Sequence, residues 1–338
     1  MRKAHGIAAG LIVVSLMVAS ELLRAQAPPR ELKLSTAAGP TVPLGRAANR
    51  WSELVARAGR STTLKVYAGA SLAQHDSLRE WQALVAGGTD AAVGSALAWS
   101  IQVPVLAVYA LPWSAPDPVA LNAIVADADV RRTIAARLES SGVVLLAMAA
   151  LGYRDVATVS HPIRSCSDLA GLRLRVVAHP MLLELYAALG AHPSAMTFAA
   201  AQGAFVEGKL DGEEGPPASL AAARIVGARD IVVTGGIGDA MLFAIRRDVW
   251  TSLDATDQQL LRSTAEQAAR EVGGAEADEA ALIDLRRQGN TVTRFGSTAI
   301  AQCRAAAQSV SDKWAQPVGQ ELVEQARAIA TRARAQTR

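Results

Sequence analysis

The stretch TLKVYAGASLAQHDSLREWQALVAGGTDAAVGS, Thr63–Ser95, predicts a strand, an amphipathic helix and a second strand in succession. Thr63–Gly69 is typical of a strand, and so is Thr89–Ser95. Between them, four apolar residues recur at helical spacing: Leu78, Trp81, Leu84 and Val85. A strand–helix–strand order favours an α/β fold with a mostly parallel sheet.

The same alternation continues on both sides of this stretch. An amphipathic helix is predicted over Thr41–Gly59. Further strands are predicted at 142–154, within 168–177, at 241–250 and at 291–295, and further helices at 131–141, 181–189, 256–287 and from 298 onward. Gly273 and Gly274 loosen the helical region 256–287. GGIG at 235–238 is interpreted as a plain connection, because it lacks the third glycine and the following helix of a dinucleotide-binding fingerprint.

Size and charge limit the classes of function. The chain has 338 residues, which suggests about two domains or one large α/β unit. Hydrophobic residues make up 51% of it, enough for a substantial core without disulfides. The formal net charge is only +3, and nearly all of the basic residues are arginines, which are dispersed along the chain. We therefore expect no nucleic-acid partner.

The N-terminal segment 1–27 is typical of a secretory signal peptide. Arg2 and Lys3 precede an apolar run, Gly6–Val18, which is short for a membrane span. Cleavage after Ala27 and cleavage after Ser20 are both compatible with the pattern, and an uncleaved anchor is the alternative. The signal predicts a periplasmic protein. In an oxidising compartment Cys166 and Cys303 could pair, and two free thiols are equally consistent with the sequence.

No catalytic motif is present. The sequence has no G-x-S-x-G, no H-E-x-x-H and no phosphate-binding loop. Its five histidines are dispersed, and His179 and His192 each precede a proline, which favours loop positions over a metal site. We therefore expect no enzyme activity, no metal and no cofactor.

Two arginines stand at predicted strand ends. Arg154 closes the strand 142–154, and Arg175 lies near the end of the strand within 168–177. Ligands of open α/β sheets gather at the carboxyl ends of strands. A guanidinium binds a carboxylate through two parallel hydrogen bonds. The two side chains could form an anion clamp, or they could be ordinary surface arginines.

The stretch GKLDGEEGPPAS, 208–219, concentrates three carboxylates among glycines and prolines. Asp211, Glu213 and Glu214 could be a catalytic acid cluster, a metal loop or part of a structural turn. A hydrolase that uses them is one alternative function. No base or ligand set accompanies them in the sequence, so this alternative has little support.

Four motifs, which occur in a fixed order along the chain, favour a ligand-binding function over these alternatives. They are GYR at 152–154, PIRSCSDLAGLRLRV at 162–176, LGAHPSAM at 189–196 and GKLDGEEGP at 208–216. Together they resemble the dicarboxylate-type solute-binding proteins of tripartite ATP-independent periplasmic (TRAP) transporters. Several motifs in the right order are far more specific than any one of them.

The resemblance implies a two-lobed α/β fold of the periplasmic-binding-protein type. Each lobe would be a mixed sheet flanked by helices, with a long helix spanning both. The implied boundaries are 31–151 plus 241–280 for lobe I and 152–240 plus 281–338 for lobe II. The protein would capture an organic acid and hand it to the membrane permease of a TRAP transporter. A ligand-binding sensor that acts with a membrane signalling protein is the alternative.

The resemblance also implies site residues. Arg175 would hold the ligand carboxylate, Arg154 would add a second contact, and Phe198 would form an apolar wall. Gly215 replaces the family's ligand-binding Asn, and Glu213 replaces its Gln. We therefore expect a ligand that is larger or more apolar than a small dicarboxylate. The stretch 208–219 would be a loop between a short strand and the lobe-spanning helix, with Glu214 in a structural hydrogen-bond role.

Overall fold

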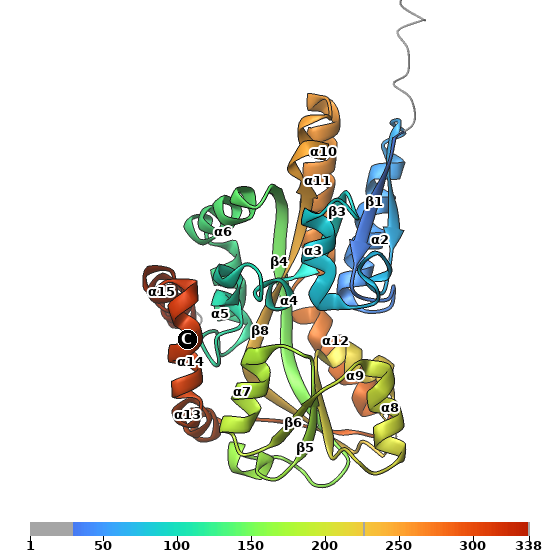
Figure 1. Cartoon of the computed structure of the whole chain (residues 1–338). Helices are drawn as coiled ribbons and strands as arrows, with labels where there is room; N and C mark the ends of the chain where they lie inside the picture. The colour runs from blue at the N-terminus through green and yellow to red at the C-terminus, as the bar shows by residue number, and fades with distance from the viewer. Residues whose placement is uncertain (1–29, 226, 337–338) are drawn as a thin grey trace, which may run out of the picture.

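Nine strands form one mixed sheet, with helices on both of its faces, in the computed structural model, which describes residues 30–225 and 227–336 (Figure 1). The strands are β1 (Arg30–Thr36), β2 (Thr62–Tyr67), β3 (Ala91–Ser95), β4 (Val143–Thr158), β5 (Arg173–Val176), β6 (His192–Ala195), β7 (Gly212–Gly215), β8 (Asp230–Arg246) and β9 (Thr291–Arg294). The strand order is β2-β1-β3-β8-β4-β7-β5-β6, and β9 pairs with β8.

The helices follow the predicted alternation in part: those at 118–126, 198–206 and 217–223 were not predicted, and residues 247–250 of the predicted strand 241–250 are helical. They are α2 (Pro43–Arg57), α3 (Glu80–Val85), α4 (Ala96–Trp99), α5 (Pro118–Ala126), α6 (Ala128–Ser140), α7 (Pro180–Ala188), α8 (Phe198–Val206), α9 (Pro217–Ala223), α10 (Arg247–Thr251), α11 (Ala255–Val272), α12 (Ala275–Arg287), α13 (Ser297–Ala306), α14 (Gln308–Val318) and α15 (Gln320–Gln336). Short 3-10 helices lie at η1 (Ser71–Ala73), η2 (Ser77–Arg79), η3 (Pro104–Tyr109) and η4 (Cys166–Leu169).

The two longest strands connect the two halves of the molecule. β4 and β8 pair antiparallel from Val143 opposite Arg246 to Thr158 opposite Asp230, and they run through both halves in Figure 1. The parallel strands β1–β3 extend the sheet in one half, and the parallel strands β5–β7 extend it in the other. The sheet is therefore mixed, not mostly parallel.

The interpretation of GGIG as a connection is wrong. Gly235–Gly238 lies inside β8, at an irregularity where the partner of β4 changes from Val232 to Ile237. Neighbouring groups crowd these glycines, since a Cβ on Gly238 would lie 2.8 Å from the Tyr109 carbonyl oxygen. Glycine is used here because other segments pack directly on the strand and because Gly235 has a φ of +58°.

Side chains that alternate along β8 divide the core of the first half. Met241, Phe243 and Ile245 pack under α2 and α11, where the ring of Trp51 lies 5.6 Å from that of Phe243. Leu242 and Ala244 face the opposite layer, which contains η3, α5 and α6. Because both faces of β8 are buried here, its sequence is a continuous apolar run and does not alternate with polar residues.

The region predicted as one long helix is two helices. α11 ends at Val272 and α12 begins at Ala275. Gly273 fits closely against β4, because a Cβ there would lie too near the Cβ of Ala149. The Gly274 N–H donates to the Ala150 carbonyl at 3.0 Å with φ at +112°. A helix spanning both lobes is therefore replaced by one helix in each half (Figure 1).

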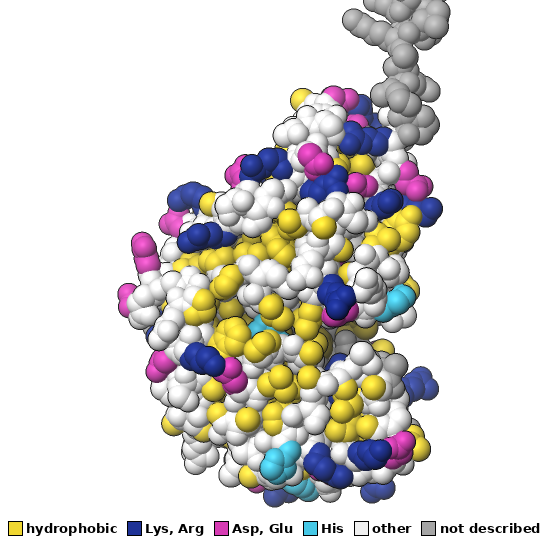
Figure 2. Space-filling view, in the orientation of Figure 1, with side chains coloured by type: hydrophobic (Ala, Val, Ile, Leu, Met, Phe, Trp, Pro, Cys, Tyr) yellow, Lys and Arg dark blue, Asp and Glu magenta, His cyan; other side chains and the backbone are white. Residues whose placement is uncertain are grey.

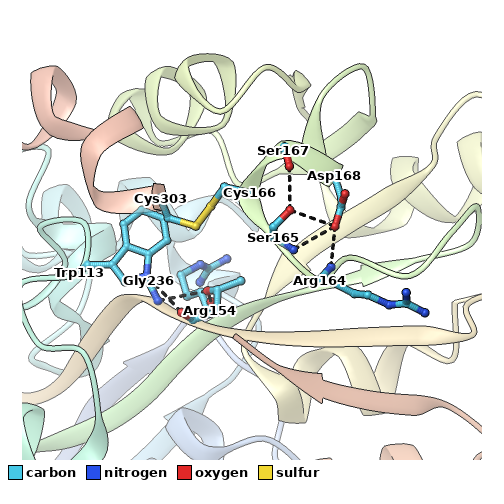
Figure 3. The surroundings of a disulfide bond; sticks show 10 residues. Trp113, Arg154, Arg164, Ser165, Cys166, Ser167, Asp168, Gly236 and Cys303 are labelled. Atoms are coloured by element: carbon cyan, nitrogen blue, oxygen red, sulfur yellow. Dashed lines mark hydrogen bonds between the residues drawn. A yellow bond between two sulfur atoms is a disulfide. The ribbon is translucent and has the colours of Figure 1, made fainter. Parts of the chain in front are cut away.

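A disulfide joins two segments that are far apart in the sequence. Cys166 in η4 and Cys303 in α13 are bonded, with their Cα atoms 5.5 Å apart (Figure 3). Of the two alternatives that the sequence left open, the structure has the bonded pair. The bond fixes α13 to the half that contains β5 and β6. From there α14 and α15 continue along the edge of the molecule to η3 and α5.

The predicted signal peptide, 1–27, lies outside the described residues. Within residues 30–225 and 227–336, no helix combines the length and apolar character needed to cross a membrane. On the face shown in Figure 2, basic side chains are interspersed with acidic ones. The lobe boundaries given above stay a prediction.

Candidate functional site

A cavity of about 470 Å³ lies where the two halves of the sheet meet. Loop residues 37–39 and the ends of β3 and α4 line it from one half, while β4, β5 and β7 line it from the other. Its polar side chains include Arg154, Arg175, His179, Glu213 and Asp239. Much of the remaining lining is apolar, as in Val42, Leu97, Leu151 and Val177. A largely apolar cavity with a few convergent charged groups is typical of a small-molecule site.

Arg175 reaches this cavity because of the alternation along β5. Leu174 and Val176 are fully buried in the core of the second half, and Arg175 points to the other side of the strand. Its Nη1 donates to Glu213 Oε1 at 2.8 Å, and its Nε donates to the Met196 carbonyl at 3.0 Å. The guanidinium is therefore oriented by fixed partners before any ligand arrives.

Glu213 lies beside Arg175 because β5 and β7 are parallel neighbours in which these two residues are register partners. Its side chain is only 3% exposed. Oε2 is buried and has no hydrogen-bond partner among the described residues. Burial, helped by the charge of Glu214 and opposed by that of Arg175, raises the pKa of Glu213 to about 7.

Arg154 and Glu214 form a separate, fully paired unit. Arg154 Nε donates to Glu214 Oε2 at 2.6 Å, and Nη2 donates to Oε1 at 2.9 Å. Oε1 also accepts the Val177 N–H at 2.9 Å, so Glu214 connects β4, β5 and β7. This confirms the structural hydrogen-bond role predicted for Glu214.

The acidic stretch 208–219 is not a loop, which corrects the sequence prediction. Gly212–Gly215 is strand β7, and Pro217 begins the seven-residue helix α9. Asp211 lies outside the cavity and holds Arg173 through two hydrogen bonds, of 2.8 and 2.6 Å. The three carboxylates therefore pair with three different arginines. Within the described part of the chain, no cluster of three or more His, Cys, Asp or Glu could hold a metal ion.

Two further predicted site residues stand at the edge of this arrangement. Gly215 ends β7 and lines the cavity. A Cβ built there would meet only Leu220, at 3.7 Å, so the space for a larger residue is open. Phe198 is the first residue of α8, and its side chain lies outside the described part of the structure.

Sequence reasoning missed two buried polar groups of the cavity. His179 caps α7 by accepting the Met181 N–H, and its Nε2 lies 3.0 Å from Ser100 Oγ. Burial, followed by the charge of Arg154, lowers its pKa to about 4, so it is neutral at pH 7. Asp239 accepts from Ser95 Oγ and from the Leu97 N–H. The His179-Pro180 pair signalled a helix start, but no local pattern marked Asp239.

Known proteins with this sequence pattern fall in one family. Residues 34–317 match the family described as bacterial extracellular solute-binding protein, family 7. The chain belongs to this family. A TRAP periplasmic solute-binding protein from Ralstonia eutropha H16, solved with bound (S)-2-acetolactate, is 34% identical to this member. That alignment covers 89% of this chain and 99% of the other, with a TM-score of 0.83.

More distant relatives extend the comparison. The C4-dicarboxylate-binding periplasmic protein DctP of Rhodobacter capsulatus is 24% identical over 297 residues, which is 86% of each chain. A solute-binding protein of Verminephrobacter eiseniae is 26% identical over 194 residues, and this match spans 56% of this chain and 57% of that protein. A TRAP protein from Shewanella oneidensis with bound succinate is 20% identical, with a TM-score of 0.79 over 90% of this chain and 100% of that one, which shows the fold alone.

Membership confirms three predictions for this family 7 protein. The resemblance to TRAP solute-binding proteins is correct, and so is the α/β binding-protein fold with a mixed sheet. The family consists of solute-binding proteins, so the expectation of a non-enzyme is confirmed as well.

Proposed function

We propose that this protein captures an organic acid in the periplasm and delivers it to the permease of a TRAP transporter. The observation that carries the proposal is the position of Arg175. Its side chain is 11% exposed, is held in place by Glu213 and Met196, and lines a cavity between the two halves of the sheet. A pre-oriented guanidinium in an apolar cavity binds carboxylates well, because little conformational freedom is lost on binding.

The ligand class follows from the remaining lining. Arg154 is already paired at Nε and Nη2 by Glu214, so its contribution to the ligand is secondary to that of Arg175. Gly215 leaves room where the family pattern has an amide side chain. These features favour an acid with apolar substituents. The Ralstonia relative holds such a molecule, (S)-2-acetolactate, which has one carboxylate.

Periplasmic delivery is supported by two further observations. The segment 1–27 has the pattern of a secretory signal, and the disulfide between Cys166 and Cys303 suits an oxidising compartment. Membership in a family of TRAP solute-binding proteins supports permease subunits as partners.

Replacing Arg175 tests the proposal. We expect Arg175→Ala to lose about 2–5 kcal/mol of binding free energy, because the ligand carboxylate would be buried without its charged partner. The measurement is calorimetric titration with 2-hydroxy-2-methylbutanoate, which shares the 2-hydroxy-2-methyl acid group of the Ralstonia ligand. Thermal stabilisation by the acid should disappear in parallel.

Arg173→Ala is the matched control. Arg173 lies two residues earlier on the same side of β5, but it is outside the cavity, where it is half exposed and pairs with Asp211. Its removal should leave the affinity unchanged within about twofold. If Arg175→Ala binds as tightly as the parent protein, the assignment of Arg175 as the carboxylate ligand is wrong.

A further inference from the structure

One buried polar atom in the cavity lacks a partner. Glu213 Oε2 accepts no hydrogen bond from any residue that the structure describes, although Oε1 of the same group is held by Arg175. Buried polar atoms in folded proteins nearly always have a partner, and an exception calls for an explanation. Because Glu213 lines the cavity, the ligand itself can supply the missing contact.

The charges around Glu213 limit what that contact can be. Arg175 faces it from β5, Arg154 from β4 and Glu214 from its own strand, while His179 and Asp239 line the same cavity. Arg154 and Glu214 neutralise each other through two hydrogen bonds. His179 is buried and neutral, and Asp239 is paired with Ser95 and the Leu97 N–H. Of the described arginines that line the cavity, Arg175 is thus the one left to balance both Glu213 and an incoming carboxylate.

We propose that Glu213 is a specificity-determining residue that binds the ligand in its protonated form. Its Oε2–H donates to the carboxylate that Arg175 holds, so the site takes monocarboxylates, and each capture takes up one proton. This inference rests on the proposed function, because it requires an acid at Arg175.

Two carboxyl groups that share one site rarely ionise together, because each raises the pKa of the other. In the free protein, protonation of Glu213 is already favoured, since burial raises the pKa of Glu213 to about 7. A ligand carboxylate beside it adds a second negative charge and raises the pKa of Glu213 further. The proton comes from solvent and remains on Glu213 Oε2 until the ligand leaves.

The same count of charges sets the ligand class. With Arg175 shared and Arg154 occupied by Glu214, a second carboxylate on the ligand would be buried without a cation. Burying an unpaired charge is strongly unfavourable. The site should therefore prefer 2-hydroxy-2-methylbutanoate to 2-hydroxy-2-methylbutanedioate, which differs from it only by a carboxylate in place of a terminal methyl.

Calorimetry of the mature protein tests the coupling. At pH 8.5, titration with 2-hydroxy-2-methylbutanoate in phosphate and in Tris should show different heats that correspond to uptake of about one proton. From pH 7.5 to 9 the affinity should fall about tenfold per pH unit, as expected for one linked proton. The dicarboxylate should bind at least about tenfold more weakly than the monocarboxylate, given the cost of its unpaired charge.

Glu213→Gln separates this proposal from a structural effect. The amide keeps a donor at the same place and cannot ionise, so proton uptake should vanish and the affinity should become independent of pH. At pH 8.5 the variant should bind the monocarboxylate about tenfold or more tighter than the parent, a gain that structural damage does not produce. Asp211→Asn, on the same stretch but outside the cavity, should retain the pH dependence of the parent.

The outcomes distinguish the two levels of inference. Binding of the monocarboxylate without proton uptake or pH dependence would overturn the role of Glu213 and leave the proposed function standing. Equal or tighter binding of the dicarboxylate would overturn the charge preference. Failure of both acids to bind the parent protein at any pH would overturn the proposed function for this ligand class, and the role of Glu213 with it.

Discussion

At the scale of single residues, the site contains a second buried ion pair beside that of Arg175, between Arg154 and Glu214. Glu214 is completely buried, and Arg154 is nearly so. Breaking such a pair by removing one partner is costly, whereas removing both charges together is often nearly neutral. The pair can therefore be separated experimentally into a contribution to folding and a contribution to ligand binding.

We expect Arg154→Ala to destabilise the ligand-free protein by about 3–5 kcal/mol, because Glu214 would be left buried without a countercharge. Urea unfolding followed by circular dichroism would measure this loss. The double variant Arg154→Met/Glu214→Gln should recover most of the stability, since the glutamine still accepts the Val177 N–H. If the double variant is less stable than Arg154→Ala, the buried charge is not the cause of the loss.

The sequence placed Arg175 correctly near the end of a strand, whereas β4 continues to Thr158, so Arg154 lies inside its strand and does not close it. It could not name their partners. Arg175 meets Glu213 only because β5 and β7 are register partners across 38 residues, and Asp239 reaches the cavity from a strand in the middle of the sheet. Cross-strand register depends on the whole sheet, so local patterns do not reveal it.

At the scale of elements, the sequence located α2, α3, α6 and α7 to within a few residues. It missed α5, α8 and α9, and it assigned residues 247–250, which belong to α10, to a strand. The glycines of β8 were taken for a connection, although they allow Trp113 and Tyr109 to pack on the strand. The strand β1, Arg30–Thr36, was missed as well, although its alternation of charged and apolar residues is typical of a strand.

Gly273 provides a test of close packing at this scale. We expect Gly273→Ala to lower stability by about 1–3 kcal/mol, because the added methyl would overlap the Cβ of Ala149 on β4. The midpoint of thermal unfolding would report the change. Gly203→Ala in α8 makes the same substitution with nothing within 4 Å of the new Cβ. It should be neutral or stabilising by up to about 1 kcal/mol, since alanine favours helix. Equal effects of the two substitutions would contradict the packing explanation.

At the scale of the whole molecule, the disulfide and the C-terminal helices connect the two halves. Cys166 and Cys303 anchor α13 beside η4, and Trp113 lies next to the bond (Figure 3). From there α14 contacts both η3 and α7, so it touches elements of both halves. The Trp314 Nε1–H adds a hydrogen bond to Glu184 Oε2 at 3.0 Å. This segment should contribute to stability more than its position at the edge suggests.

We expect the double variant Cys166→Ala/Cys303→Ala to be less stable by about 2–5 kcal/mol, because the bond closes a loop with a sequence separation of 137 residues. Denaturant unfolding of the parent protein should give a free energy of unfolding that is lower by a similar amount when a reducing agent is present. The midpoint of the double variant should not respond to the reductant. A parent protein whose midpoint is also insensitive to reduction would contradict this contribution.

The pairing of β3 with β8 has a consequence for how the chain is made. Ala91 of β3 pairs with Ile245 of β8. The sheet of the first half is therefore incomplete until well over half of the polypeptide has been synthesised. During that interval β3 presents an open edge, which is a site for mispairing with other chains. Contacts this distant in sequence also form slowly. The nascent chain should therefore depend on chaperones for longer than a protein in which each half is built from one continuous segment.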